Sequence, residues 1–227
     1  MEISRRHFDD ELRELKTHRL RMGGTVEAMV ADAVEALSLR DAARAQAVEA
    51  SDREVDFMEM KADRLAAGII ALRQPAASDL RHVIAALKIS TDLERIGDLA
   101  ANLASRVVEQ SAEPPLDPDP ELPGMATRVR DMTARALQAF VDDSAAEARK
   151  VLTADQEVDD MHRRIFFRLR DRMLADREVV ERATRLMFIS KYLERIADHA
   201  TNVAEEVIFA VEGVDVRHGQ GREIEPA

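Results

Sequence analysis

Cysteine and tryptophan are absent from this 227-residue chain, tyrosine occurs once, and aromatic residues make up only 4% of it. Without cysteine, the chain can form neither a disulfide framework nor a thiolate metal site, and we expect a cytoplasmic protein. Its 8 glycines and 7 prolines are too few for a turn-rich β-sandwich. Alanine, leucine, valine, methionine and charged residues dominate instead, and this composition predicts an all-α protein.

Long apolar runs are also lacking. The most apolar segment, residues 85–103, contains five charged residues, so we expect no membrane-spanning helix. The first ten residues are charged and contain no signal-peptide pattern. The formal net charge of −11 opposes binding to nucleic acid, because that affinity depends on cationic contacts with phosphate, and it opposes adsorption to anionic lipid.

Prolines mark the division of the chain. Five of the seven lie in residues 113–124, where they exclude the interior of a helix or a sheet. We therefore expect a first repeat at 1–112, a linker at 113–124, a second repeat at 125–212 and a polar tail at 213–227.

Apolar residues spaced three and four apart predict three helices in each half, which run antiparallel as a bundle. Asp41, Ser78 and Ser144 are the expected caps of the second, third and fifth helices, and Glu147 completes a capping box with Ser144. The expected helices span about 8–39, 42–74, 78–110, 125–141, 145–174 and 177–211.

The two halves repeat each other. Leu-Glu-Arg-Ile-Gly-Asp at 93–98 returns as Leu-Glu-Arg-Ile-Ala-Asp at 193–198, an offset of 100. In the two preceding helices the offset is 103, as in Val55 and Val158. The chain therefore reads as a tandem repeat of a three-helix unit, with three residues fewer in the second hairpin.

Carboxylates spaced by four residues, and so on one face of a helix, occur as two pairs in each repeat. They are Asp52 with Asp56, Glu94 with Asp98, Asp155 with Asp159, and Glu194 with Asp198. An antiparallel hairpin brings residues equidistant from its turn to one level. The first two pairs are centred on residue 75 and the other two between residues 176 and 177, where turns are expected.

Each half should thus present four carboxylates at one level, with Asn102 or Asn202 one turn further along. Packed helices lie about 8–10 Å apart, a gap that two acidic side chains can bridge through a cation. Oxygen ligands suit Mg, Mn, Fe or Zn. These ten residues are our predicted metal ligands. His162 and His199, beside acids, are weaker candidates.

Two other interpretations remain open. The acids could form a solvated face of a purely structural adaptor, or the bundle could be a metal-dependent enzyme or metal store. No P-loop, nucleophile elbow or dinucleotide-binding glycine pattern is present, so an enzyme would have to be built from the acidic clusters alone.

One turn has no counterpart in the second half. It contains Arg73, Gln74, Pro75, Asp79 and Arg81. Ordinary turn chemistry explains a proline and a cap here, but the asymmetry makes these five residues a candidate surface for binding a partner.

The doubled Glu-x-x-x-Asp motif, the Gln-Pro-x-x-x-Asp-Leu-Arg turn at 74–81 and the opening His-Phe-x-x-Glu-Leu at 7–12 together resemble the PhoU family. The resemblance covers about residues 7–212. It implies two pseudo-symmetric antiparallel three-helix bundles in a cytoplasmic, often homodimeric protein that is not an enzyme. Such proteins negatively regulate phosphate uptake and the phosphate-starvation response, between the ATPase of the phosphate ABC transporter and a sensor histidine kinase.

The resemblance also implies metal at the repeated motif, as iron or zinc clusters in some members and Mn or Mg in others. Carried over, the motif falls on Glu94, Asp98, Glu194 and Asp198, with the acids of the second and fifth helices opposite. Two departures, Gly97 against Ala197 and Leu99 against His199, predict clusters that differ in ligands or occupancy.

Overall fold

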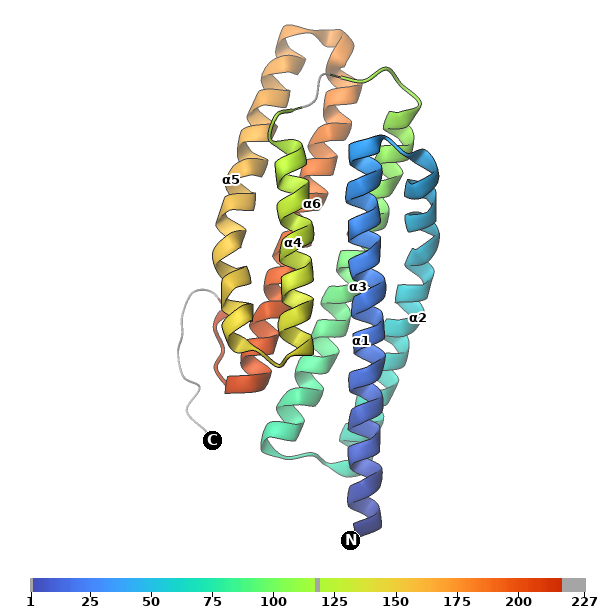
Figure 1. The fold of residues 1–227 in the computed structure, drawn as a ribbon, viewed down its shortest axis with the longest axis vertical. Helices are drawn as coiled ribbons and strands as arrows, with labels where there is room; N and C mark the ends of the chain where they lie inside the picture. The colour runs from blue at the N-terminus through green and yellow to red at the C-terminus, as the bar shows by residue number, and fades with distance from the viewer. Residues whose placement is uncertain (1, 117–118, 218–227) are drawn as a thin grey trace.

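The computed structural model describes residues 2–116 and 119–217, and these are almost entirely helical (Figure 1). Long helices account for most of them, with one short 3-10 helix, η1, before the last. The elements are α1 Glu2–Leu39, α2 Ala42–Arg73, α3 Ala77–Ser111, α4 Leu122–Val141, α5 Ala145–Ala175, η1 Arg177–Val179 and α6 Val180–Glu212. The predicted all-α fold of six helices is confirmed.

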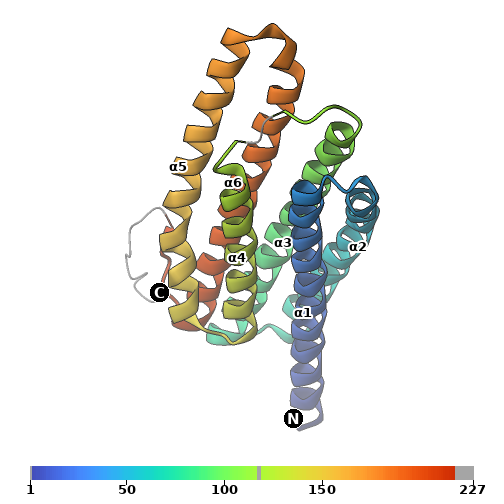
Figure 2. The ribbon, with the colours of Figure 1, turned by 45° about the horizontal axis from the view of Figure 1, so that its top comes forward.

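The six helices form two antiparallel bundles, α1 to α3 and α4 to α6, which lie side by side (Figure 1). Helices α3 and α6 pack against each other where the bundles meet, and α1 contacts α4. The turn between α2 and α3 and the turn between α5 and α6 lie at opposite ends of the molecule, as the rotated view in Figure 2 also shows.

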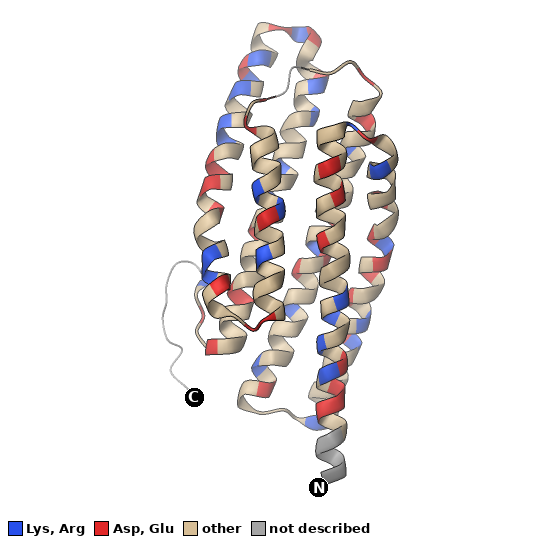
Figure 3. Cartoon of the chain, viewed as in Figure 1, with Lys and Arg blue, Asp and Glu red and all other residues tan. Residues whose placement is uncertain are grey.

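One continuous apolar core joins the bundles, because buried residues from all six helices belong to a single cluster. A smaller cluster around Leu15, Ile69 and Val83 lies within the first bundle. Charged residues of both signs are interspersed along the helices (Figure 3). Within the described residues, no helix joins the length to the apolar character that a membrane crossing requires.

Capping by Asp41 and Ser144 is confirmed. Asp41 Oδ1 accepts a hydrogen bond from the backbone N–H of Arg44 at 3.0 Å, and Ser144 Oγ accepts one from that of Glu147 at 3.3 Å. Glu147 turns its carboxylate to Lys150 Nζ at 2.6 Å, so only half of the capping box forms. Each cap fixes the start of a helix that carries two of the predicted acids.

The prediction that Ser78 caps α3 is wrong. The N-cap is Ala76 and the helix begins at Ala77, so Ser78 lies in its first turn. The chain reverses direction before it reaches Ser78, because Gln74 and Ala77, on either side of Pro75, both have the left-handed φ of 48°.

Two helices begin earlier than predicted. Helix α1 begins at Glu2 instead of about Phe8, and α4 begins at Leu122, inside the proline-rich stretch. Pro123 is tolerated there because the first turn of a helix needs no donor at that position. Residues 117–118 of the expected linker and 218–227 of the expected tail lie outside the described residues.

The end of the linker is fixed to α5. Asp119 is only 3% exposed, and its two oxygens accept hydrogen bonds from Nε and Nη2 of Arg168, both at 2.7 Å. Burial alone would raise the pKa of Asp119, but the Arg168 guanidinium, together with hydrogen bonds from the backbone N–H groups of Glu121 and Leu122, outweighs it and lowers the pKa. Arg164 binds Glu121 beside it, at 2.9 Å. The second bundle is therefore held to its own linker by a bidentate ion pair.

Candidate metal centres

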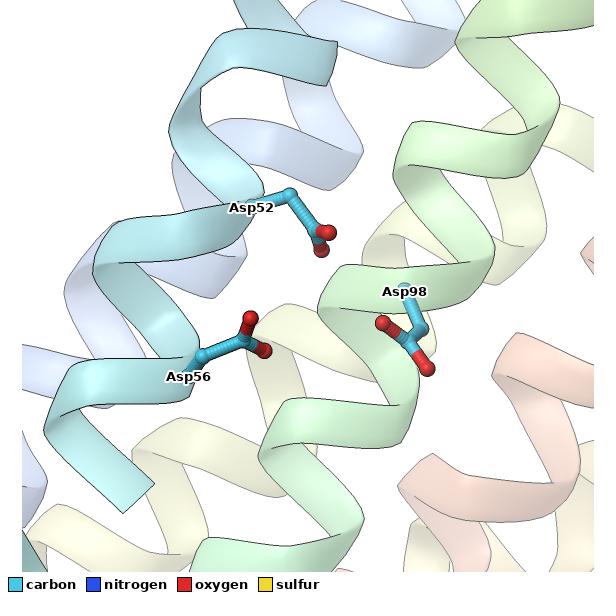
Figure 4. Close-up of side chains that lie close together, drawn as sticks. All are labelled: Asp52, Asp56 and Asp98. Atoms are coloured by element: carbon cyan, nitrogen blue, oxygen red, sulfur yellow. The ribbon is translucent and has the colours of Figure 1, made fainter. Parts of the chain in front are cut away.

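The first acidic cluster lies between α2 and α3 (Figure 4). Asp52 and Asp56 project from successive turns of α2 toward Asp98 of α3, and one oxygen of each carboxylate lies within 4.8 Å of the others. The hairpin thus brings these three acids to one level. We call Asp52, Asp56 and Asp98 cluster 1.

Close packing beneath cluster 1 sets its width. Val55, which lies between the two acids of α2, is fully buried, and it packs against Gly97 of α3. A Cβ at Gly97 would lie only 3.3 Å from Val55 Cγ1. The missing side chain therefore lets α3 approach α2 directly behind Asp98.

Glu94 lies beside cluster 1 rather than within it. Its side chain is 13% exposed, and its Oε2 is buried without a hydrogen bond. Burial, and then the charge of Asp98, raises the pKa of Glu94 from 4.5 to about 7, although Arg95 opposes the shift. Glu59 of α2 also contributes to the shift. Even with Arg95 beside it, Glu94 is therefore partly protonated near pH 7, and a bound metal ion would favour its ionised form.

The second acidic cluster lies between α5 and α6. Asp155 and Asp159 of α5 and Asp198 of α6 each place one oxygen within 4.8 Å of the others. We call these three residues cluster 2. Although the second hairpin is three residues shorter, the acids of α5 still lie opposite Asp198 of α6, as their equal distances from the turn predict. Glu194, like Glu94, lies beside the three and acts on their pKa values.

Cluster 2 holds its protons more tightly than isolated aspartates do. Burial, followed by the charge of Glu194, raises the pKa of Asp198 from 3.8 to about 6. Burial also raises the pKa values of Asp155 and Asp159. Asp155 Oδ1 is buried and accepts no well-directed hydrogen bond, although the nearby Thr201 hydroxyl moderates its pKa shift. A buried carboxylate oxygen without such a partner is unfavourable unless a cation is bound to it.

The acids beside the two clusters have different basic partners. Lys191 Nζ lies 2.5 Å from Glu194 Oε2 in the second repeat. Its counterpart in the first repeat is Thr91, whose hydroxyl donates to the carbonyl of Leu87. There Arg95 contacts Glu94 at 3.4 Å instead.

The two predicted asparagines are placed differently. Asn102 is exposed on α3, one turn beyond Asp98. Asn202 donates from Nδ2 to Asp92 Oδ1 at 3.1 Å, across the contact between α3 and α6. His199 Nδ1 donates to the same oxygen at 2.8 Å. In this structure Asn202 and His199 therefore join the two bundles.

His162 lies near cluster 2. Its Nδ1 is 3.1 Å from Ser190 Oγ, and burial lowers its pKa while Glu194 and Asp159 oppose the shift. At neutral pH an imidazole with a lowered pKa is uncharged and able to bind a metal ion. Its counterpart in the first repeat, at the offset of 103, is Glu59.

Sequence reasoning missed one of these neighbours. Glu59 is absent from the predicted ligands, although it lies three residues after Asp56, on the same face of α2. The signal was helical spacing around an acid already identified. Lys191 is predicted from the sequence on one face with Asp198, but as part of a solvated face and not as the partner of Glu194.

The donor sets fit a metal ion. Three carboxylates per cluster supply hard oxygen ligands from two facing helices, and buried oxygens of Glu94 and Asp155 lack hydrogen-bond partners. A bound cation would offset both causes of the raised pKa values, the burial of the carboxylates first and then their mutual repulsion. Both clusters could therefore bind metal, and the ligand types do not select one metal among Mg, Mn, Fe and Zn.

The candidate partner-binding turn is held in a defined shape. Arg73 binds both oxygens of Glu11, at 2.7 and 2.9 Å, and Gln74 adopts the left-handed conformation before Pro75. Asp79 is exposed in the first turn of α3. The guanidinium of Arg81 lies over Gly213, where an added Cβ would be 3.5 Å from its Nε.

Comparison with known proteins finds the same family domain in each of the two repeats. The family model described as the PhoU domain matches residues 20–107 and again residues 122–207. The chain is 39% identical over 210 residues to a phosphate-specific transport system accessory protein PhoU homolog from Caulobacter vibrioides, covering 92% of this chain and 91% of that protein. A PhoU homolog from Zymomonas mobilis is 40% identical, covering 91% and 87%.

Solved structures of PhoU proteins have the same fold as this chain. The crystal structure of PhoU from Pseudomonas aeruginosa superposes with a TM-score of 0.86 at 38% identity, covering 91% of this chain and 99% of that one. The phosphate transport system regulatory protein PhoU from Streptococcus pneumoniae gives a TM-score of 0.84 at 29% identity, covering 92% and 99%. With two matched domains, six helices in the same arrangement and these relatives, the chain belongs to the PhoU family of phosphate transport accessory and regulatory proteins, which is not a family of enzymes.

Proposed function

We propose that this protein negatively regulates phosphate uptake and the phosphate-starvation response as a metal-binding adaptor. Its partners would be the ATPase subunit of a phosphate ABC transporter and a sensor histidine kinase, in the cytoplasm and without nucleic acid or membrane insertion. The observation that carries the proposal is the match of both repeats to the PhoU domain. The names of the relatives, which describe transport accessory and regulatory proteins, support it.

Metal would serve this adaptor by joining helices rather than by turnover. Cluster 1 with Glu94 would hold one ion or group of ions, and cluster 2 with Glu194 another; Asn102 and Asn202 remain proposed outer ligands. Bound cations would neutralise the carboxylates and draw α2 toward α3 and α5 toward α6. Metal occupancy would thereby set the shape of the face that partners meet.

Partner binding would use the turn that only the first repeat has, with Arg73, Gln74, Pro75, Asp79 and Arg81. The bidentate pair of Arg73 with Glu11 gives this turn a fixed geometry, which favours recognition. We further propose a homodimer, with 1–112 and 125–212 as its repeats.

Deletion of the gene in its own organism tests the regulatory role. The deletion strain should express a starvation-response reporter even in phosphate-rich medium, and a plasmid copy should silence it. Purified ATPase subunit and kinase cytoplasmic portion from that organism should each bind the protein. A silent reporter in the deletion strain would contradict negative regulation, and absence of binding would contradict the adaptor.

A further inference from the structure

The contact between α1 and α4 has two ends that the duplication makes equivalent. The two helices run antiparallel and side by side (Figure 1). At the offset of 103, Arg19 of α1 corresponds to Leu122 of α4, and Leu37 of α1 corresponds to Phe140 of α4. Arg19 meets Phe140 at one end of the contact, and Leu37 and Leu122 line one cavity at the other. Both ends are therefore built on the same pair of positions.

At one end the linker lies against this contact. The two leucines line a cavity of about 220 Å³ together with Pro115 and Leu116 of the linker, and Leu116 packs against the core. Arg40 holds the linker in place, because its Nη2 donates to the backbone carbonyl of Glu113 at 2.6 Å. An extended segment that carries proline, leucine and an acidic residue thus occupies this end.

At the other end the equivalent groove is open. It has a volume of about 420 Å³, and its lining residues all belong to α1 and α4. Leu20 and Val141 line it and correspond, at the offset of 103, to Pro123 and Ser38, which line the cavity at the linker end. We call this open site the α1–α4 groove. Within the described residues, no part of the linker lines it.

Two consecutive glycines of α1 shape the α1–α4 groove. At Gly23 an added Cβ would lie 3.1 Å from Leu137 Cδ2, so the missing side chain lets α4 approach α1. At Gly24 an added Cβ would meet nothing within 4 Å. Glycine is unfavourable in the interior of a helix, and packing against α4 explains it only at Gly23. The effect of Gly24 is to widen the groove.

A buried cation without an ionic partner lies beside the groove. Arg19 is only 7% exposed, and burial lowers the pKa of its guanidinium to about 10. Phe140 supplies a cation–π contact, with its ring centroid 4.5 Å from the guanidinium carbon, but Nε of Arg19 is buried and donates no hydrogen bond. Asp143, the acid that acts on Arg19, is already paired with Lys16 Nζ at 2.7 Å. A buried charge in this state favours the approach of an anionic group.

The other charges of the groove do not replace such a group. Glu27 of α1 and Arg135 of α4 are both exposed, and their charges are opposite, so together they add no net charge. Asp142, at the end of α4, accepts a hydrogen bond from Gln138 at 2.7 Å and is not among the charges that act on Arg19. Selection for a negative group therefore comes from Arg19.

We infer that the α1–α4 groove binds an extended segment of a protein partner that carries proline and leucine beside a carboxylate. The apolar side chains would lie over Gly24, and the carboxylate would pair with Arg19 at the edge formed by Phe140. The linker supports this choice, because a segment of the same chemistry occupies the equivalent position at the other end. Proline-rich segments are extended before they bind and lose little freedom on binding.

A second copy of this chain is a poorer source of the segment, because its own linker is already held in its own cavity. The inference adds a contact surface to the proposed adaptor, apart from the turn at 73–81. Its test requires neither the transporter nor the kinase, so the two proposals can fail separately.

A peptide with the sequence of residues 112–117, Ala-Glu-Pro-Pro-Leu-Asp, is the probe, titrated into protein labelled with ¹⁵N-glycine. The amide resonances of Gly23 and Gly24 should shift until the peptide saturates the groove. That of Gly68 in α2, where an added Cβ also meets nothing within 4 Å, should not shift. Gly24→Leu fills the groove and should weaken peptide binding at least tenfold, and Gly68→Leu is the matched control.

Arg19→Met tests the ion pair with the carboxylate. This variant should weaken binding of the acidic peptide about tenfold, but it should not change the affinity of a peptide in which glutamine and asparagine replace the two acids. Methionine keeps most of the apolar volume beside Phe140. Equal losses for both peptides would overturn the role of Arg19 in binding the carboxylate.

Each result decides the matter, provided that thermal melting shows all variants to be folded. Unshifted resonances of Gly23 and Gly24 at millimolar peptide would overturn the inference and leave the adaptor function standing. Shifts at Gly124, next to Pro123, without shifts at Gly23 and Gly24 would place the peptide in the linker's own cavity and would also overturn it. A changed oligomeric state in Gly24→Leu with unchanged peptide affinity would identify an interface between copies instead.

Discussion

The two acidic clusters share their three aspartates but not their surroundings. Cluster 1 has Glu59 and Arg95 beside it, where cluster 2 has His162 and Lys191. The first set of neighbours offers an additional carboxylate, whereas the second offers an imidazole and a direct counter-charge for Glu194. Duplication thus preserved the oxygen ligands, while the surrounding residues diverged, so the two sites should differ in metal affinity and preference.

Removing the aspartates of one cluster should have the largest effect. Asp52→Ala with Asp98→Ala should abolish metal at the first site and leave the second occupied, because the two clusters lie between different pairs of helices. Elemental analysis of the folded variant should show about half the metal of the unaltered protein, and Asp155→Ala with Asp198→Ala is its matched counterpart. Unchanged metal content would exclude cluster 1 as a site.

Exchanging the residue types at positions 91 and 191 should change the metal affinities of the two clusters in opposite directions. Lys191→Thr removes a positive charge from cluster 2, so we expect metal to bind there about tenfold more tightly, whereas Thr91→Lys should weaken cluster 1 by a similar factor. Isothermal titration with Mn²⁺ would measure both. Equal affinities in all variants would show that these neighbours do not tune the sites.

The pH dependence of stability should distinguish the metal-free from the metal-bound protein. Glu94 has a pKa raised from 4.5 to about 7 and Asp198 one raised from 3.8 to about 6, so the folded state retains protons that the unfolded state loses. The resulting stabilisation is complete below the unfolded pKa values and is lost as the pH rises through about 6 to 7.

Thermal melting after chelation should therefore show Tm falling across this range, and Glu94→Gln should reduce the fall. Saturating metal should restore stability at the upper end, by about 2.7 kcal/mol at a hundred times the Kd. A Tm that is independent of pH without metal would contradict the raised pKa values.

Gly97→Ala should have the smallest effect, since two terms oppose each other. Alanine favours a helix over glycine by about 0.8–1.0 kcal/mol, but its Cβ would lie 3.3 Å from Val55 Cγ1 and require Val55 to shift. The second repeat already has Ala197 at this position, buried against its own α5–α6 contact. We expect a change within about 1 kcal/mol in urea unfolding, and a larger loss would show that Val55 cannot adjust.

The six helices and the positions of the two acidic clusters could be predicted from the sequence, because helical spacing and the duplication are both periodic. The level of Asp52 with Asp98 follows from counting residues on either side of Pro75, without any knowledge of packing. The positions of His199 and Asn202 could not be predicted in this way, because their partner Asp92 is on the other bundle, 107 and 110 residues earlier in the chain. Their orientation depends on how the bundles meet, which no local pattern records.

Ser78 shows a second limit. Its residue type and position favour a cap, yet backbone in the left-handed region at Gln74 and Ala77 turns the chain two residues sooner. Such a conformation is uncommon for residues other than glycine, so composition gives no warning of it.

The linker gives the pairing of α3 with α6 a further property. The chain between Ser111 and Asp119 joins the two bundles covalently, and the pair of Asp119 with Arg168 anchors its end to α5, so the bundles meet at an effective concentration that this short connection sets. Their association is therefore independent of how much protein the cell makes. Cleavage between Ser111 and Asp119 would make the association of the halves depend on their concentration.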